Sequence, residues 1–321
     1  MIKWLVSLIA LVALSNVVTG WEYWRWLSLR KPSEKTQLKG LFLIIAIASV
    51  VIVFLYTSPF YLLFMSNLAP LISYFLVLLF VALLFVALFR GSIQCKKVIE
   101  HRKLKEIDYY VCDNKVSNAW YVPKENKIFV SKDLVHILNE DELYAVLLHE
   151  QGHSKNKRLS ILNGLLTFAW VIIVLLIVET MLALSISQTN VSTETKLALI
   201  AWLYGMGIVI TQPLLAISWI EEHEADLNAL QRCPSLAETL VTGLIKLEVS
   251  SRLSPHLNVN FSIDIREIDI QEVRMRSVLK EFFCSVVFSV PRTVMDFIKK
   301  PIYVTHPPVW LRAYCLKRHI L

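Results

Sequence analysis

The sequence predicts a mainly α-helical, integral-membrane protein with about five transmembrane helices and a cytoplasmic α+β domain that contains a small sheet. Composition is the first reason, because the 321-residue chain is 55% hydrophobic and only 18% charged, unlike an ordinary soluble protein. Distribution is the second, because the apolar residues gather in sustained runs. The stretch between the third and fourth runs has no run of membrane length, which predicts a domain outside the bilayer.

The apolar runs supply the predicted transmembrane helices. A helix needs about 20 apolar residues to cross a bilayer core, and the last three runs reach that length whereas the first two are shorter. Loops rich in Lys and Arg alternate with loops that are poor in them, which predicts a cytoplasmic α+β domain and an N-terminus outside. The runs are residues 4–18, 41–56, 68–89, 161–184 and 197–220.

Short segments between the third and fourth runs predict the small sheet. Residues 107–111, 119–122 and 127–131 are rich in β-branched and aromatic side chains, which favours strands. Pro123 opens a turn between the last two of these segments. Further along the chain, residues 237–249 are predicted to form a helix.

The segment from His149 to His153 reads His-Glu-x-x-His and follows an apolar-periodic run. Histidines four positions apart on a helix share one face, so both imidazoles reach one metal ion. Zn²⁺ is the expected ion, because neutral imidazole suits its borderline softness. Glu150 lies where it would deprotonate an attacking water and later protonate a leaving amine. The competing interpretation is a helix with two surface histidines and a carboxylate.

A third ligand is expected, because a catalytic zinc usually takes three protein ligands. The acidic segment Glu-Glu-His-Glu-Ala-Asp directly follows the fifth apolar run. Glu222 and Asp226 share a helical face, so Glu222 would reach the metal while Asp226 accepts the free ring N–H of a ligating histidine. Glu221, His223 and Glu224 are alternative ligands, and a solvated acidic turn is the interpretation without a metal.

Four segments form a pattern that is more specific than any one of them. In order, residues 116–131 hold an Asn-Ala-Trp strand and a second strand, residues 139–153 hold the metal helix, residues 222–226 read Glu-x-x-Ala-Asp, and residues 306–312 read His-Pro-Pro-x-x-x-Arg. This pattern resembles the HtpX-like and CAAX prenyl protease family of integral-membrane zinc metallopeptidases, and the HtpX-like members more closely.

The resemblance implies a zincin-like catalytic domain with one zinc ion per chain. It also implies that His306 and Arg312 approach the site and stabilise the oxyanion, which is sensible chemistry for a cationic side chain. The implied base is Glu150, and the implied ligands are His149, His153 and Glu222.

An edge strand is implied to receive the substrate as an added strand, held by main-chain hydrogen bonds. We expect Lys127–Ser131 to be this edge strand. The expected substrate-binding residues are Asn118, Ala119, Ile128, Phe129 and Val130.

The predicted function is a zinc endopeptidase of the cell membrane that cleaves membrane or membrane-proximal proteins at the cytoplasmic face, in protein quality control. The alternatives are a CAAX-type prenyl protease, a zinc-binding sensor or scaffold without turnover, and a transporter that only the span count and Glu179 would favour. The predicted parts are a membrane region at 1–90, catalytic parts at 91–160 and 221–321, and a transmembrane hairpin at 161–220.

The charge and the cysteine content limit the classes of partner that are expected. The net charge of +7 suits anionic headgroups of a lipid bilayer, and no nucleic-acid motif accompanies it, so nucleic-acid binding is not expected. The five cysteines are an odd number on the predicted cytoplasmic side, which argues against a disulfide framework. The expected partners are therefore peptide or membrane-protein substrates and the bilayer.

Overall fold

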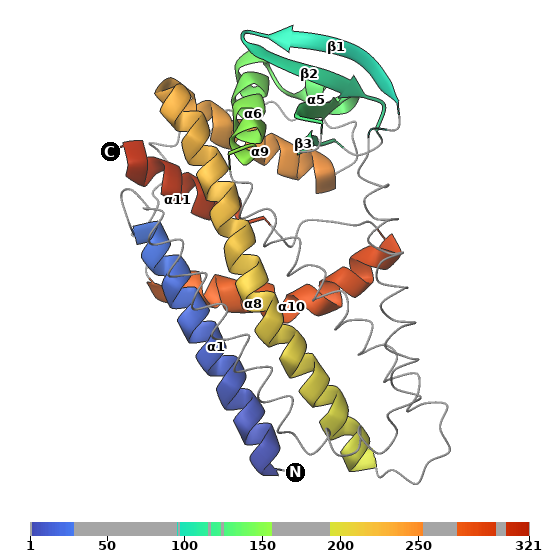
Figure 1. Ribbon diagram of the computed structural model, residues 1–321, viewed down its shortest axis with the longest axis vertical. Coiled ribbons are helices and arrows are strands. Elements are labelled where there is room, and N and C mark those ends of the chain that lie inside the picture. Colours follow the sequence, from blue (N-terminus) through green and yellow to red (C-terminus); the bar gives the residue numbers. More distant parts are fainter. Residues whose placement is uncertain are drawn as a thin grey trace. The chain divides into compact units, whose positions relative to one another are not determined.

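The structure is a computed structural model, and its helices and strands are labelled in Figure 1. It divides into two compact units. Unit 1 contains Met1–Ser92, Leu162–Ile217 and Arg274–Thr305, and unit 2 contains Ile93–Ile161, Ser218–Val273 and His306–Leu321. The residues that the structure describes are 2–28, 95, 97–114, 117–122, 125–155, 193–252, 275–299 and 306–320.

Unit 2 contains a four-stranded mixed sheet with the strand order β1-β2-β4-β3. Strand β2 pairs antiparallel with β1 and parallel with β4, and β3 pairs antiparallel with β4. The strands are β1 (Val98–Leu104), β2 (Ile107–Cys112), β3 (Ala119–Val122) and β4 (Lys127–Ser131). The last three match the predicted segments. Strand β1 was not predicted, because its side chains are almost all exposed and show no alternation of apolar and polar residues.

Strand β4 lies inside the sheet, so the prediction that Lys127–Ser131 is an edge strand is wrong. Both of its sides are already paired, one with β2 and the other with β3. Ile128, Phe129 and Val130 therefore cannot receive an added strand. Within the described part of the chain, β1 and β3 are the strands at the edges of this sheet.

Helix α6 (Glu140–His153) is fixed at its N-terminus by a capping box. The Asn139 side chain accepts a hydrogen bond of 2.8 Å from the Glu142 N–H, and the Glu142 carboxylate accepts one of 2.9 Å from the Asn139 N–H. That carboxylate also forms a buried ion pair with Lys246 of α9 (Ala237–Arg252), at 2.8 Å. These contacts hold the N-terminus of α6 on α9. They thereby help to fix the orientation of the last turns of α6, which contain His149 and His153.

The core of unit 2 lies where α6 and α9 meet the sheet, and includes Val130, Leu134, Leu147 and Leu240. Helix α9 confirms the helix predicted at residues 237–249. The remaining elements are α5 (Lys132–Ile137), the C-terminal part of α8 (Thr193–Arg232), the 3₁₀ helix η1 (Pro234–Leu236) and α11 (Val309–Ile320).

Unit 1 contains α1 (Ile2–Ser28), the N-terminal part of α8 and α10 (Met275–Lys299). The rings of Tyr23 in α1 and Phe282 in α10 stack with their centroids 6.1 Å apart. The Gln212 side chain of α8 donates a hydrogen bond of 3.3 Å to the Val12 carbonyl of α1. Both contacts join α1 to its neighbours.

The prediction of five transmembrane helices is wrong. Among the described residues, no helix is both long enough and apolar enough to cross a membrane. Polar residues such as Asn16 in α1 and Gln212 in α8 interrupt the first and fifth apolar runs, and both side chains are buried. What the structure describes is a set of helices with one small mixed sheet. The other three predicted runs and Glu179 lie outside the described residues.

Candidate metal centre

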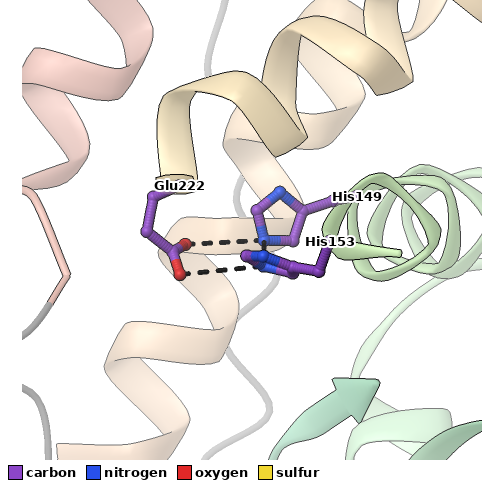
Figure 2. A group of neighbouring side chains, drawn as sticks. All are labelled: His149, His153 and Glu222. Atoms are coloured by element: carbon purple, nitrogen blue, oxygen red, sulfur yellow. Dashed lines mark hydrogen bonds and ion pairs between the residues drawn. The ribbon is translucent and has the colours of Figure 1, made fainter. Parts of the chain in front are cut away.

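Three side chains from two helices of unit 2 converge on one point (Figure 2). His149 and His153 come from the last turns of α6, and Glu222 comes from the part of α8 in unit 2. One potential ligand atom of each residue lies within 4.8 Å of the others. The structure thus brings together the two histidines and the carboxylate that the sequence singled out.

The donor spacing fits one zinc ion. A tetrahedral ion with ligands at about 2.0–2.1 Å keeps its donor atoms about 3.3 Å apart. The Nε2 atoms of His149 and His153 are 3.2 Å apart. The Glu222 carboxylate oxygens lie 3.5 Å from the first of these atoms and 3.7 Å from the second. The first distance belongs to Oε2 and the second to Oε1, so the carboxylate presents one oxygen to each imidazole. The three residues thus form a donor triangle whose size suits one zinc ion.

The neighbours of Glu222 occupy other places. Glu221 Oε1 is 3.8 Å from Nδ1 of His153, which is the ring nitrogen that points away from the donor triangle. Among the acidic residues that the sequence left open, Glu222 has the carboxylate that faces both Nε2 atoms.

Asp226 orients the first histidine and is itself clamped by an arginine. Its Oδ1 lies 2.9 Å from Nδ1 of His149, so it accepts the ring N–H that a metal-bound imidazole leaves free. Arg312 of α11 donates to both Asp226 oxygens, at 2.8 and 2.6 Å. Its guanidinium also lies 3.4 Å from Glu222 Oε2. All of these side chains are buried.

The charges around these groups shift their pKa values strongly. Burial would raise the pKa of Asp226, but Arg312 outweighs it and holds that pKa far below its usual range. Burial would likewise lower the pKa of His149, but its contacts with Asp226 and Glu222 outweigh it and raise the pKa to about 9. A proton on the His149 ring would therefore compete with a metal ion for this site.

Glu150 lies beside the ligands and is held by the sheet. Its Oε2 accepts a hydrogen bond of 2.9 Å from the backbone N–H of Tyr121 in β3. Its side chain is buried, and burial raises the pKa of Glu150 above the ordinary value for a glutamate. A raised pKa suits a general base that works near neutral pH.

His306 approaches the same point from the segment before α11. Its Nε2 is 3.8 Å from Glu222 Oε1, and its side chain is 44% exposed. Arg312, by contrast, is buried and held on Asp226. The two residues that were expected to act together therefore differ, since the His306 side chain is accessible to solvent and the Arg312 side chain is not.

Gly152 lets α6 and α8 approach closely between the ligands. A Cβ atom at this position would lie 2.8 Å from the Ala225 carbonyl oxygen and 2.9 Å from the Ala225 Cα. These are backbone atoms, so the two helices would have to move apart. Sequence reasoning did not single out Gly152 or Tyr121, because each is identified by a contact with a distant segment.

Replacing Gly152 with Ala is expected to weaken metal binding at least tenfold and to destabilise the protein by about 1–3 kcal/mol, as overpacking does. The Gly243→Ala variant is the matched control, since a Cβ there would lie 3.4 Å from a side-chain atom of Val146. Because alanine is the better helix former, this control should be neutral or stabilising. Zinc competition with a chromophoric chelator and thermal unfolding check both variants, and equal behaviour would contradict the role of Gly152.

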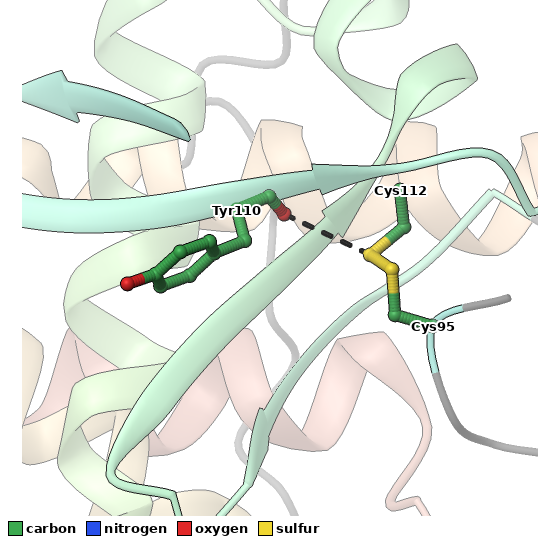
Figure 3. The surroundings of a disulfide bond; sticks show 3 residues. All are labelled: Cys95, Tyr110 and Cys112. Carbon is green, nitrogen blue, oxygen red and sulfur yellow. Dashed lines mark hydrogen bonds between the residues drawn. A yellow bond between two sulfur atoms is a disulfide. The ribbon is translucent and has the colours of Figure 1, made fainter. Parts of the chain in front are cut away.

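A disulfide joins Cys95 to Cys112 at the end of β2 (Figure 3). The expectation that a disulfide framework is absent left this single bond unpredicted. That expectation rested on the odd number of cysteines and on an assumed reducing compartment, and neither excludes one pair brought together by the fold. The other described cysteines, which form no disulfide, are Cys233, Cys284 and Cys315.

Reduction of this disulfide is expected to cost about 3 kcal/mol, because the bond closes a loop between residues 17 positions apart. A reductant should therefore lower the Tm of the wild-type protein. It should leave the Tm of the Cys95→Ser variant unchanged, because that variant has no such disulfide. Without reductant, the Tm of this variant should be lower than that of the wild type. The Cys233→Ser variant, which removes a free thiol, should respond to reductant as the wild type does. A wild-type Tm that is insensitive to reductant would contradict this prediction.

The fold and the site define a metallopeptidase domain: a helix with two histidines and a carboxylate base, a third ligand from a second helix, and a small sheet beside them. The chain belongs to peptidase family M48, whose model matches residues 93–320. This match confirms the HtpX-like resemblance that the motifs indicated.

One curated relative is the Protease HtpX homolog of Picrophilus torridus, which is 28% identical to this chain over 151 residues. The match covers 46% of this chain and 48% of the relative, so it spans about half the length of each. No solved structure shows a significant match to the chain.

Proposed function

We propose that this protein is a zinc-dependent endopeptidase that cleaves an extended segment of a protein substrate. The observation that carries the proposal is the hydrogen bond between Tyr121 N–H and Glu150 Oε2. It joins an edge strand, where an extended peptide would bind, to the carboxylate beside the three donors.

His149, His153 and Glu222 would hold the metal. Bound there, zinc would polarise the carbonyl of the scissile bond and lower the pKa of a water to about 7. Glu150 would take the proton from the attacking water and pass it to the leaving amine. The Tyr121 N–H fixes one oxygen of this carboxylate, which leaves the other for the water.

The substrate would add to β3. The Asn118 carbonyl accepts a hydrogen bond from Ser131 N–H of β4. Because hydrogen-bonded residues alternate along an antiparallel strand, the backbone groups of Trp120 also point toward β4. Ala119 and Tyr121 then direct their backbone groups to the open edge, as the Tyr121 bond to Glu150 indicates. The peptide would hydrogen-bond to the backbone groups of Ala119 and to the Tyr121 carbonyl, because the Tyr121 N–H is already bonded to Glu150, and it would lie across the three donors.

His306 and Arg312 would act differently. The exposed imidazole of His306 would donate a hydrogen bond to the oxyanion that forms at the scissile carbonyl. Arg312 would be a positioning residue, because its bidentate pair fixes Asp226, which in turn fixes the ring of His149.

We further propose that the substrates are membrane proteins, or segments close to a membrane surface, and that the role is quality control. In support, α1 exposes the apolar side chains of Val6, Ile9 and Leu14 by 59%, 60% and 63%, and the chain carries a net charge of +7 that would attract anionic lipids. A cytoplasmic active site stays a prediction. The disulfide weighs against it, because disulfides persist in oxidising compartments.

Purified protein is expected to contain one zinc per chain and to cleave casein in detergent, and an excess of chelator should abolish cleavage until zinc is restored. The measurements are metal analysis and mass spectrometry of the products. Zinc binding without any cleavage would instead indicate a sensor or scaffold. Cleavage that survives removal of the metal would refute the proposal. Flotation of the full-length protein with anionic and neutral vesicles tests the membrane part.

A further inference from the structure

A line of four rings crosses the sheet of unit 2. It runs from His101 of β1 through Tyr110 of β2 and Phe129 of β4 to Trp120 of β3, and the register pairs each ring directly with the next. The ring centroids are 4.8, 5.5 and 5.9 Å apart along this line. Each strand thus contributes one ring at the same level of the sheet.

The rings lie on the face of the sheet opposite the core. Strand neighbours of these rings, such as Tyr109, Val111, Ile128 and Val130, belong to the hydrophobic core. Because successive side chains of a strand point to opposite faces, the rings point away from that core. The line therefore lies outside that core cluster: Phe129 within it is buried, Tyr110 and Trp120 are half-buried, and His101 is exposed.

The line ends at Trp120, which is half-buried and lies on the edge strand. The next residue, Tyr121, directs its N–H away from β4 and toward Glu150. A peptide added to this edge would become the fifth strand of the sheet. Its residue opposite Trp120 would then place a side chain next to the indole, at the same level as the four rings.

We propose that Trp120 selects a large apolar side chain, above all an aromatic one, in the substrate residue that pairs across from it. This rests on the proposed function, since it names the substrates of the same site. Aromatic pairs across neighbouring strands are favourable beyond the area they bury, enough for a preference of about two- to tenfold over alanine.

The selected position lies close to the cleaved bond. The substrate residue opposite Tyr121 lies at Glu150, where the proton transfers occur, so the residue opposite Trp120 is its neighbour along the peptide. The residues on either side of the selected one point to the other face of the sheet, toward the metal site. Trp120 would therefore contact a substrate side chain that does not touch the groups that perform the chemistry.

The test uses quenched peptides based on a cleavage site mapped in casein, with Phe or Ala at each position near the cleaved bond. At one position the wild-type kcat/KM for Phe should exceed that for Ala by about fivefold. In the Trp120→Thr variant this ratio should fall to about one, and in Trp120→Phe it should persist. The ratio does not depend on the folded fraction, so a partly unfolded variant still gives an answer.

The control is His101→Ala, which removes the ring at the far end of the line and should leave the ratio as in wild type. Fluorescence anisotropy with the same peptides on the Glu150→Gln variant gives the binding ratio without turnover. A Phe preference in binding that disappears with Trp120→Thr supports the inference even if no peptide is cut. Cleavage with no Phe preference at any position, or a preference that survives Trp120→Thr, overturns the inference and leaves the peptidase assignment intact.

Discussion

The Glu150→Gln variant is expected to lose cleavage by at least about 10²–10⁴-fold while it still binds one zinc per chain. The amide cannot take a proton from the attacking water. Its oxygen can still accept the 2.9 Å hydrogen bond from Tyr121 N–H, so the strand and the helix keep their contact. The loss should therefore appear in kcat, with zinc content and Tm close to those of wild type.

Glu140→Gln is the matched control, because it makes the same change in an exposed residue of the same helix, far from the ligands. It should leave kcat, zinc content and KM within about twofold, as surface changes usually do. Wild-type rates in Glu150→Gln would show that another group activates the water.

The Glu222→Ala variant is expected to lose stoichiometric zinc and, with it, all cleavage. Two imidazoles alone leave an incomplete site. The zinc affinity should therefore fall by more than the 10–100-fold that is typical when a residue hydrogen-bonded to a metal ligand is removed. Arg312 keeps its bidentate pair with Asp226, so the variant should remain folded. Metal analysis after gel filtration, together with thermal unfolding, measures both expectations.

Glu221→Ala is the control for this variant, because its carboxylate faces the outer nitrogen of His153 and not the donor triangle. It should retain one zinc per chain. If zinc is lost from Glu221→Ala and kept in Glu222→Ala, the third ligand is Glu221 and the donor triangle is wrong.

The metal helix could be predicted because the pattern that identifies it lies within a few consecutive residues. The two histidines four positions apart share a face by helical periodicity alone, and Glu150 lies between them for the same reason. The acidic segment was also visible, but four of its residues stayed open as ligands. Only the distances to both Nε2 atoms favour Glu222, since those depend on how α8 lies against α6.

Hydropathy is an average over a run of residues, and it hides single polar residues. Asn16 and Gln212 are such residues in the first and fifth apolar runs, and both side chains are buried. The same helix α1 exposes the apolar side chains of Val6, Ile9 and Leu14, so the apolar character of a run did not decide which of its side chains are buried.

By itself, the sequence determined which residue types carry the chemistry, where the metal helix, the helix at 237–249 and three of the four strands lie, and the family. These follow from periodicities of a few residues. The tertiary structure decided that β3 and not β4 is at the edge, that Cys95 joins Cys112, and that Gly152 must lack a side chain. Each of these is a contact between segments far apart in the chain, and no local pattern of side chains specifies which distant segment will pair with another.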